Sequence, residues 1–481
     1  MEKLNKMNSD ISQTSIDSIF SILKEKNNLQ QLKNSSSKER IAKIKKIEAY
    51  ILNPKNHNSI AQALFKDLRK SNEEVISTEI TPIVLTIKNV YKNLKDWMLD
   101  KHVPSPLTMA GMSSYVKYEP KGTVLILSPW NYPFQLTVIP LIYAIAAGNA
   151  VLIKPSEISK NTSGILKLMI NELFSENEVA ILEGDASVAT KILKKPFNHI
   201  FFTGSPAVGK IIMRAAAEHL SSFTLELGGK SPVIIDETAN IKSTAEKIAW
   251  GKCLNSGQTC IAPDYAIIHK SKTAAFLKEF EKTINKFYNS DNKGIENSKD
   301  YCRIINEKNY LRILSLIDDA VNNGAQKVIS SSSIKEDNFI PPTVLTNVSF
   351  EMKIMQEEIF GPVLPVFEYE NKEEVIDYIH LLPTPLALYI MSNSNKNITY
   401  FMNNTSAGGS AINELMVTTV NPNLPFGGFN NSGIGKSNGK HSFIDFSNER
   451  GVVKRKWGNL KLIYPPYSEK IYDLFKKIIR L

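Results

Sequence analysis

The strongest constraint on the fold is a regular alternation of short apolar strands with helices, which begins at Gly122. The alternation continues to a predicted strand at 223–227 and resumes after Ser231. Strands that alternate with helices favour a parallel, doubly wound sheet, whose ligands bind beyond the carboxyl ends of the strands. We therefore predict an α/β protein with two doubly wound units.

The predicted elements of the two units follow from apolar runs and helical spacing. In the first unit, strands are predicted at 123–127, 150–154, 179–182, 199–202 and 223–227, with helices at 133–147, 162–173 and 186–193 and a helix that opens after Gly204. In the second unit, strands are predicted at 233–236 and 265–269, with helices at 243–254, 274–287 and 310–322.

Five other segments have patterns of their own. Residues 14–100 have helical spacing, and Ser36 with Glu39 forms a candidate capping box. Residues 103–122 indicate an extended arm or hairpin, 330–338 a surface loop, and 451–454 a strand. The tail at 471–481 is an amphipathic helix with a basic face, for which docking on the protein itself or a partner subunit is favoured over contact with an anionic membrane.

Composition excludes several classes of protein. The 481 residues suit two or three domains, and the net charge of +10 is spread without a Lys/Arg run interleaved with aromatics, so no nucleic-acid partner is expected. The three cysteines lack metal-ligand spacing, so we expect no metal site and a reducing compartment. No apolar run reaches about 20 residues and no signal peptide is evident, so we expect a cytoplasmic location.

The stretch Gly257-Gln258-Thr259-Cys260 carries the first candidate for chemistry. A cysteine thiolate is a strong nucleophile once its pKa is lowered. Most free cysteines are instead small buried apolar residues, and Cys260 by itself favours that interpretation. The case for catalysis depends on the other motifs.

Four further motifs follow predicted strands. Glu226 ends a strand beside two glycines, where a carboxylate could act as a general base or simply pair with a lysine. Asn131 lies in a proline-bounded turn, where its amide could hold an oxyanion or satisfy the turn. The turn at 202–209 could bind phosphate or be an ordinary tight turn, and Lys154 with Glu157 could bind ribose hydroxyls or be a solvated pair. Taken alone, each motif favours its ordinary interpretation. Taken together, all four follow strands of one parallel sheet and are therefore expected at one edge of it.

These motifs resemble those of the aldehyde dehydrogenase superfamily. The segments 67–71, 78–80 and 464–466 resemble its class 3 branch, which acts on fatty or aromatic aldehydes. The motifs that carry the resemblance are Ser-Pro-Trp-Asn-Tyr-Pro-Phe at 128–134, Lys-Pro-Ser-Glu at 154–157, Phe-Thr-Gly-Ser at 202–205, Glu-Leu-Gly-Gly-Lys-Ser-Pro at 226–232, Gly-Gln-Thr-Cys at 257–260, Glu-Glu-Ile-Phe-Gly-Pro at 357–362 and Pro-Phe-Gly-Gly at 425–428.

The resemblance implies NAD(P)-dependent oxidation of medium- or long-chain aliphatic or aromatic aldehydes to carboxylic acids. Cys260 would form a thiohemiacetal and then a thioester, Asn131 would hold the oxyanion, and Glu226 would activate water. A glutamate at the adenosine ribose favours NAD, with NADP as the alternative. The implied cofactor contacts are Trp130, Lys154, Glu157, Gly204, Ser205, Val208, Gly209, Glu358 and Phe360.

The resemblance also implies a domain plan, a homodimer and a place for the substrate. Tyr132 and Thr418 are expected at the substrate, with Thr418 in place of a histidine common in class 3, whereas Cys302 is structural. An acyl-transferring or coenzyme-A-dependent relative and a non-catalytic structural homologue stay open as alternatives. The expected parts are a dinucleotide-binding domain at 1–99 and 123–227, a catalytic domain at 228–415, oligomerisation segments at 100–122 and 416–456, and a tail at 457–481.

Overall fold

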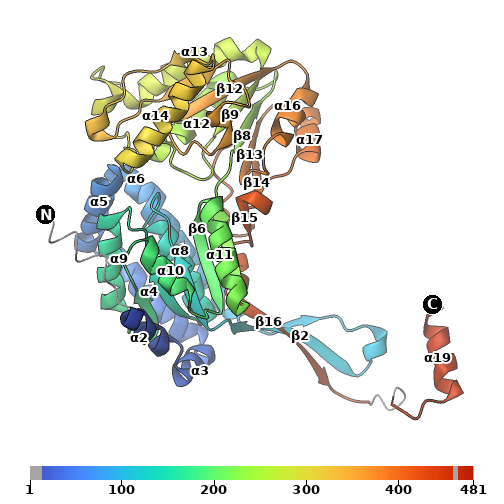
Figure 1. Cartoon of the computed structure of the whole chain (residues 1–481). Coiled ribbons are helices and arrows are strands. Elements are labelled where there is room, and N and C mark those ends of the chain that lie inside the picture. Colours follow the sequence, from blue (N-terminus) through green and yellow to red (C-terminus); the bar gives the residue numbers. More distant parts are fainter. Residues whose placement is uncertain (1–12, 459–463, 480–481) are drawn as a thin grey trace.

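The computed structural model describes residues 13–458 and 464–479. Two α/β bodies lie one above the other, and an arm projects from the lower body (Figure 1). The N-terminal residues 1–10 and Arg480 of the predicted basic tail lie outside the described residues.

The lower body is built on a sheet in the order β15-β7-β6-β3-β4-β5. The five strands β7, β6, β3, β4 and β5 are parallel to one another, while β15 runs antiparallel to β7. The strands are β3 (Thr123–Leu127), β4 (Ala150–Lys154), β5 (Val179–Ile181), β6 (His199–Gly204), β7 (Ser222–Leu227) and β15 (Gly433–Ile434). The helices between them are α8 (Gln135–Ala147), α9 (Lys160–Leu173), α10 (Ala186–Leu193) and α11 (Pro206–His219).

The upper body has a second sheet, in the order β10-β11-β12-β9-β8-β13-β14, whose edge strand β10 is antiparallel to β11 while the other neighbours are parallel. The two parallel sheets confirm the predicted α/β fold. The strands are β8 (Pro232–Ile235), β9 (Tyr265–His269), β10 (Gln326–Ile329), β11 (Thr343–Thr346), β12 (Val363–Tyr369), β13 (Ala387–Met391) and β14 (Gly409–Ile412). The helices are α12 (Ile241–Cys253), α13 (Lys270–Tyr288), α14 (Glu307–Asn322), α15 (Lys353–Gln356), α16 (Lys372–His380) and α17 (Asn395–Asn404).

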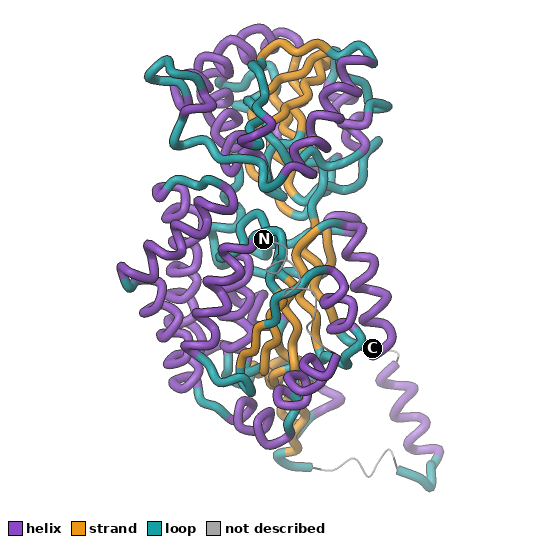
Figure 2. Tube along the Cα trace, turned by 60° about the vertical axis from the view of Figure 1, so that its left-hand side comes forward, coloured by secondary structure: helices purple, strands orange, loops and turns teal. Residues whose placement is uncertain are grey.

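The N-terminal helices cover the lower sheet (Figure 2). Ser36 caps α4 through the predicted capping box with Glu39. Apolar side chains of α4 and α7, such as Ile44 and Ile87, share a buried core with Val124 of β3. The helices are α2 (Gln13–Leu23), α3 (Lys26–Asn34), α4 (Ser37–Leu52), α5 (Pro54–Leu68), α6 (Asn72–Val75), the π-helical turn η1 (Ile76–Ile80) and α7 (Thr81–Trp97).

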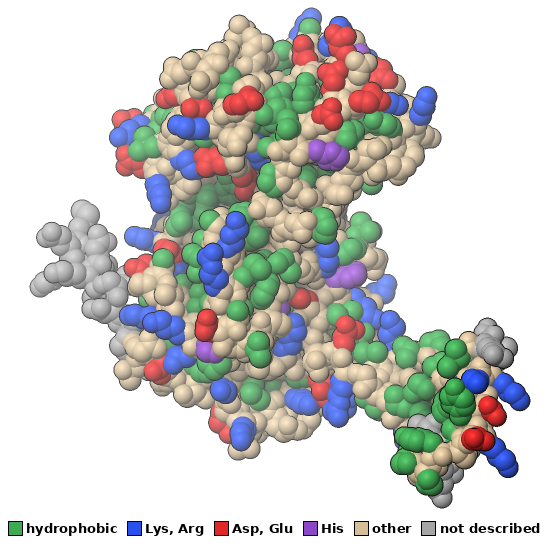
Figure 3. All heavy atoms as spheres, turned by 45° about the vertical axis from the view of Figure 1, so that its right-hand side comes forward, with side chains coloured by type: hydrophobic (Ala, Val, Ile, Leu, Met, Phe, Trp, Pro, Cys, Tyr) green, Lys and Arg blue, Asp and Glu red, His purple; other side chains and the backbone are tan. Residues whose placement is uncertain are grey.

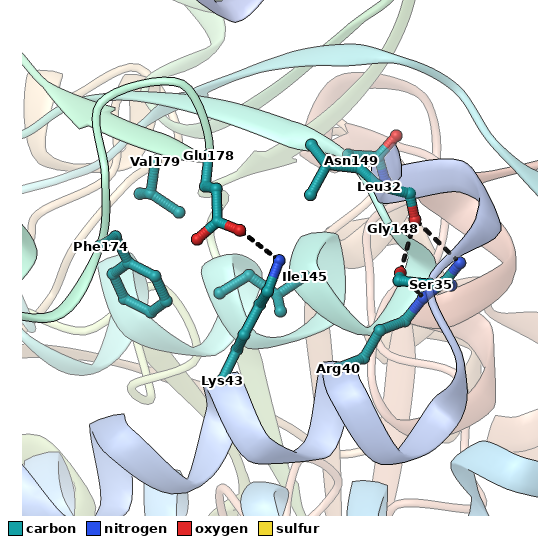
Figure 4. Close-up of a pocket in the computed structure, with 10 residues that line it drawn as sticks. All are labelled: Leu32, Ser35, Arg40, Lys43, Ile145, Gly148, Asn149, Phe174, Glu178 and Val179. Atoms are coloured by element: carbon teal, nitrogen blue, oxygen red, sulfur yellow. Dashed lines mark hydrogen bonds and ion pairs between the residues drawn. The ribbon is translucent and has the colours of Figure 1, made fainter. Parts of the chain in front are cut away.

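Arg40 of α4 fixes the carboxyl end of α8. Its buried guanidinium donates to the carbonyl oxygens of Ala146 (2.9 Å) and Lys33 (3.1 Å) beside a small cavity of about 10 Å³ (Figure 4). Burial lowers the pKa of Arg40 to about 10, which keeps it charged at neutral pH. A cation is favourable at the carboxyl end of a helix, so Arg40 anchors α8 at the end remote from Asn131.

The arm is an antiparallel sheet in the order β1-β2-β16, which agrees with the predicted hairpin. The strands are β1 (Lys101–Val103), β2 (Met112–Pro120) and β16 (Ser447–Arg455), preceded by α18 (Gly439–Asp445). The helix α19 (Glu469–Ile479) lies beyond the tip of the arm, and hydrophobic side chains gather on both (Figure 3). Across residues 13–458 and 464–479, no helix has both the length and the apolarity of a membrane span.

Two details differ from the sequence-based expectation. The predicted surface loop at 330–338 contains a short 3-10 helix (Lys335–Asp337), and a β-bridge joins Ile334 to Phe339. Within the predicted oligomerisation segment 416–456, β15 joins the lower sheet, because Gly433 pairs with Glu226. The proposed domain boundaries stay a prediction.

Candidate active site

The Cys260 loop follows a tight turn at the end of α12. Asn255, Ser256 and Gly257 all have positive φ, and a Cβ on Gly257 would collide with the carbonyl oxygen of Gly361. Only glycine tolerates that approach without strain, which explains the glycine of the motif. The turn leaves Cys260 half-buried, whereas the other two cysteines are fully buried.

Asn131 and Tyr132 lie directly against the residues that precede Cys260. The Asn131 side-chain amide donates to the carbonyl oxygen of Gln258 at 3.0 Å, and the Tyr132 hydroxyl lies 2.8 Å from the Thr259 hydroxyl. Asn255 donates in turn to the carbonyl oxygen of Asn131 at 2.8 Å. The turn after β3 and the Cys260 loop are therefore locked together, although more than a hundred residues separate them.

Glu226 lies near the carboxyl end of β7 and is 7% exposed. Its Oε1 accepts a 2.6 Å hydrogen bond from the Ser437 hydroxyl, and its Oε2 is buried without a hydrogen-bond partner among the described residues. Burial raises the pKa of Glu226 to about 7, and the hydrogen bond from Ser437 acts against this rise. A carboxyl group with a pKa near neutrality is suited to general base catalysis.

Electrostatics connect Cys260 with two carboxyl groups. Burial, followed by the carboxylates of Glu358 and Glu226, raises the pKa of Cys260 to about 12. Burial also raises the pKa of Glu358 to about 8. Both carboxyl groups thus lie close enough to Cys260 to affect its charge, and the thiol form of Cys260 predominates at neutral pH in the free site.

Glu358 is held against Gly228 by a network from the upper body. A Cβ on Gly228 would collide with the Glu358 carboxyl group, so this contact requires glycine. The buried Lys230 donates to the carbonyl oxygens of Ile354 (2.8 Å) and Glu357 (3.0 Å) and pairs with Asp264. Lys230 therefore fixes the segment that carries Glu358.

The predicted cofactor contacts come from two parts of the chain, the turns after β3, β4 and β6 and the segment between α15 and β12. Trp130 and Phe360 face each other edge to face, with ring centroids 5.3 Å apart. Lys154, at the end of β4, forms a 2.6 Å ion pair with the exposed Glu157. Ser205 caps α11 after β6, where it accepts from the backbone N–H of Val208 at 3.4 Å. Trp130, Lys154, Glu157 and Ser205 follow strands β3, β4 and β6, at one edge of the lower sheet.

Gly204, Gly209 and Thr418 complete the predicted set. Gly204 ends β6, and the buried Gly209 packs on Leu227 at the start of α11. Thr418 lies beside Gly409 of β14, and its assignment to the substrate stays a prediction. The structure thus brings Asn131, Glu226 and Glu358 to the Cys260 loop, while the roles of all these residues are taken up as proposals below.

Several residues that support the site were not predicted from the sequence. Ser437 follows the Pro-Phe-Gly-Gly motif and has the appearance of a turn residue. Lys70 and Glu79 lie in segments that resembled the class 3 branch, but their charges look like a solvated helix face. The structure buries both, with Lys70 1% and Glu79 0% exposed.

Comparison with known proteins decides the family. The model of the aldehyde dehydrogenase family matches residues 7–452. The chain belongs to the aldehyde dehydrogenase family. It is 43% identical to the 4,4'-diaponeurosporen-aldehyde dehydrogenase of Staphylococcus aureus over 92% of this chain and 95% of that protein. It is 40% identical to the dimeric, NADP-preferring aldehyde dehydrogenase of Rattus norvegicus over 86% and 91% of the two chains.

A solved structure agrees. The chain is 41% identical to a structure described as the substrate-bound state of Staphylococcus aureus AldH, with a TM-score of 0.90, and the match covers 96% of this chain and 99% of the other. The predicted family, α/β fold and enzymatic function are confirmed. This aldehyde dehydrogenase is an NAD(P)-dependent enzyme that oxidises aldehydes.

Proposed function

We propose that Cys260 is the nucleophile, that Asn131 and the Cys260 backbone N–H stabilise the oxyanion, and that Glu226 is the general base. The observation that carries the proposal is the convergence on the Cys260 loop of a buried amide and two carboxyl groups from separate segments. A nucleophile, an oxyanion donor and a base within one site constitute the apparatus of acyl transfer.

The chemistry follows from these positions. The Cys260 thiol loses its proton to solvent, the thiolate sulfur forms a bond to the aldehyde carbon, and the carbonyl oxygen becomes an oxyanion that accepts hydrogen bonds from the Asn131 amide and the Cys260 N–H. Bound NAD(P) would supply the hydride acceptor, so that loss of hydride from the carbon as the C=O bond re-forms would leave a thioester on Cys260. Glu226 then takes a proton from water, whose oxygen attacks the thioester. The C–S bond breaks, Cys260 leaves as thiolate, and the carboxylic acid is released.

The residues at the edge of the lower sheet fit a dinucleotide. The first turn of α11 contains no acidic residue, so the positive end of this helix is available to a pyrophosphate beside Gly204 and Ser205. Lys154 supplies a donor and Glu157 an acceptor for ribose hydroxyls. Trp130, Glu358 and Phe360 would hold the nicotinamide half, close to Cys260.

The substrate class and cofactor preference are finer parts of the proposal. Exposed apolar side chains on the segment around Thr418, among them Val420 (66%) and Phe429 (51%), favour medium- or long-chain aliphatic or aromatic aldehydes. A carboxylate at Glu157 repels a 2′-phosphate, so we expect NAD to be preferred over NADP. A cytoplasmic homodimer completes the proposal, since the relative from Rattus norvegicus is named as dimeric.

Retention of Glu226 favours water as the acyl acceptor over coenzyme A. The deciding experiment follows NADH formation with a panel of aldehydes for the wild type, Cys260→Ala and Glu226→Gln. We expect no turnover from Cys260→Ala, and from Glu226→Gln a burst of NADH followed by a stall as the thioester accumulates. Full turnover by Cys260→Ala would refute the mechanism. Turnover that requires added coenzyme A would establish the acyl-transferring alternative.

A further inference from the structure

A buried ion pair lies beneath the turn that carries Asn131 and Tyr132. Lys70 Nζ lies 2.7 Å from Glu79 Oε1, and both side chains are fully buried. The pair belongs to the N-terminal helical region and lies outside the motifs that are predicted to form the site. Burying two charges is costly, and an apolar pair of the same volume is often at least as stable, so the ion pair needs an explanation beyond stability.

Local structure explains how the pair is formed. Arg69, in the left-handed conformation, caps the carboxyl end of α5, and Ser71 caps the amino end of α6, so Lys70 lies in the short turn between the two helices. Glu79 lies in the π-helical turn η1 that joins α6 to α7. A π-turn inserts one extra residue into the helix and often marks a functional site. Glu74 of α6 and Glu79 of η1 both accept hydrogen bonds from backbone N–H groups of the site, those of Asn255 and Gln135.

Both members of the pair also contact the segment from Asn131 to Gln135. Lys70 Nζ donates to the carbonyl oxygen of Asn131 at 3.2 Å and lies 3.8 Å from the centroid of the Tyr132 ring. Glu79 Oε2 accepts from the backbone N–H of Gln135, the first residue of α8, at 2.8 Å. A carboxylate is favourable at a helix N-terminus. The pair therefore holds both ends of the short segment from Asn131 to Gln135.

A second carboxyl group of the same helix reaches the Cys260 loop. Glu74 accepts from the backbone N–H of Asn255 at 3.0 Å and from the Cys302 thiol at 3.2 Å. Asn255 donates to the same carbonyl oxygen of Asn131 that Lys70 contacts. One helical segment thus fixes the oxyanion donor and the nucleophile loop with respect to each other.

We propose that Lys70 and Glu79 are positioning residues that aim the Asn131 amide and the Tyr132 ring at the substrate carbonyl beside Cys260. The proposal rests on the role of Asn131 given above. Displacement of an oxyanion donor by about 1 Å costs on the order of a hundredfold in rate even when the displaced group is intact. Loss of the pair should therefore reduce catalysis through Asn131 and leave the nucleophile itself in place.

The test is a double-mutant cycle on kcat/KM. The variants are Lys70→Met and the double variant Lys70→Met/Glu79→Gln, each in the wild-type and the Asn131→Ala background. The double variant removes both charges and keeps an acceptor for the Gln135 N–H. It therefore leaves no unpaired buried charge that would prevent the protein from folding. Arg40→Met is the matched control, because it removes an equally buried cation from the opposite end of α8. Alkylation of Cys260 by iodoacetamide, followed by mass spectrometry, reports on the nucleophile without cofactor or substrate.

We expect both pair variants to lower kcat/KM by about 10- to 100-fold in the wild-type background, with the fall mostly in kcat. In the Asn131→Ala background the further loss should be under about threefold, because the amide that the pair aims is absent. The rate of Cys260 alkylation should stay within about twofold of wild type, and Arg40→Met should leave kcat unchanged.

The outcomes distinguish failure of the proposed role of Asn131 from failure of the positioning role of Lys70 and Glu79. If Asn131→Ala itself retains full activity, the proposed role of Asn131 fails. If Asn131→Ala is impaired and the pair variants impose the same factor with or without the amide, the positioning proposal is overturned while the role of Asn131 stands. A loss of kcat in Arg40→Met equal to that of the pair variants would also overturn it, because the effect would then be general to α8.

Discussion

The Ser437 hydroxyl donates a 2.6 Å hydrogen bond to Oε1 of Glu226 across 211 residues of chain. The pairing of Gly433 with Glu226 in the β15–β7 ladder brings the two segments together. The hydrogen bond favours the ionised carboxylate, while burial favours the protonated form, and the pKa of about 7 reflects the balance. The segment after the Pro-Phe-Gly-Gly motif thus tunes the proposed base.

Ser437→Ala should shift the pH dependence of thioester hydrolysis. Without the hydrogen bond the pKa of Glu226 rises further above its usual range, so the acidic limb of the rate profile should move to higher pH by roughly one unit. At pH 6 we expect about a tenfold lower steady-state rate, with the NADH burst preserved. Ser432→Ala is the control, since its hydroxyl bonds to the Phe429 backbone within the same loop and not to Glu226. Identical profiles for the two variants would contradict the role of Ser437.

Glu226→Gln should stabilise the fold while it abolishes hydrolysis. The pKa of Glu226 is about 7 in the folded protein, above the ordinary value of 4.5. Below about pH 4.5 the group is protonated in both states and does not change the free energy of unfolding. Between about pH 4.5 and pH 7 it ionises in the unfolded state first, which lowers that free energy progressively. Above pH 7 the full cost applies, up to about 3 kcal/mol, and glutamine avoids it.

Urea unfolding at pH 4.5 and pH 8 measures this difference. The variant should gain stability over wild type at pH 8 and lose most of that gain at pH 4.5. Glu73→Gln, which removes an exposed glutamate, should give no such pH-dependent gain. A Glu226→Gln protein that is less stable than wild type at pH 8 would show that the carboxylate is satisfied in the fold.

The sequence was sufficient to predict β3 to β7 of the lower sheet and β8 and β9 of the upper sheet, but not β10 to β15. Cys260, Asn131 and Glu226 could be proposed because each lies in a short local motif, and β3 and β4 have the predicted bounds. The supporting contacts could not be predicted, because they join segments remote in the chain. Nothing local to Lys70 reveals that its ammonium group meets the carbonyl oxygen of Asn131, 61 residues away. The sequence pattern shows which residues are charged, but not which of these charges are buried.

Glu157→Gln should relax the choice of cofactor. Removal of the carboxylate paired with Lys154 eliminates repulsion of a 2′-phosphate and frees a lysine to attract it. We expect the ratio of kcat/KM for NADP to that for NAD to rise about tenfold, mostly through the KM for NADP. Glu178→Gln is the control, because this glutamate pairs with Lys43 at the other end of the sheet. An unchanged ratio would remove Glu157 from the adenosine site.

Val453→Lys should dissociate the proposed homodimer. Val453 lies in β16 of the arm and is 54% exposed, and the neighbouring Trp457 is 67% exposed. Exposed apolar side chains on a projecting sheet indicate a surface that a partner subunit covers, and a buried unpaired lysine would be costly there. Light scattering after size exclusion should show a shift from dimer to monomer. Val328→Lys supplies the comparison, since this valine is also exposed (42%) but lies on edge strand β10 of the upper body. Dissociation by Val328→Lys together with a stable Val453→Lys dimer would move the interface from the arm to the upper sheet.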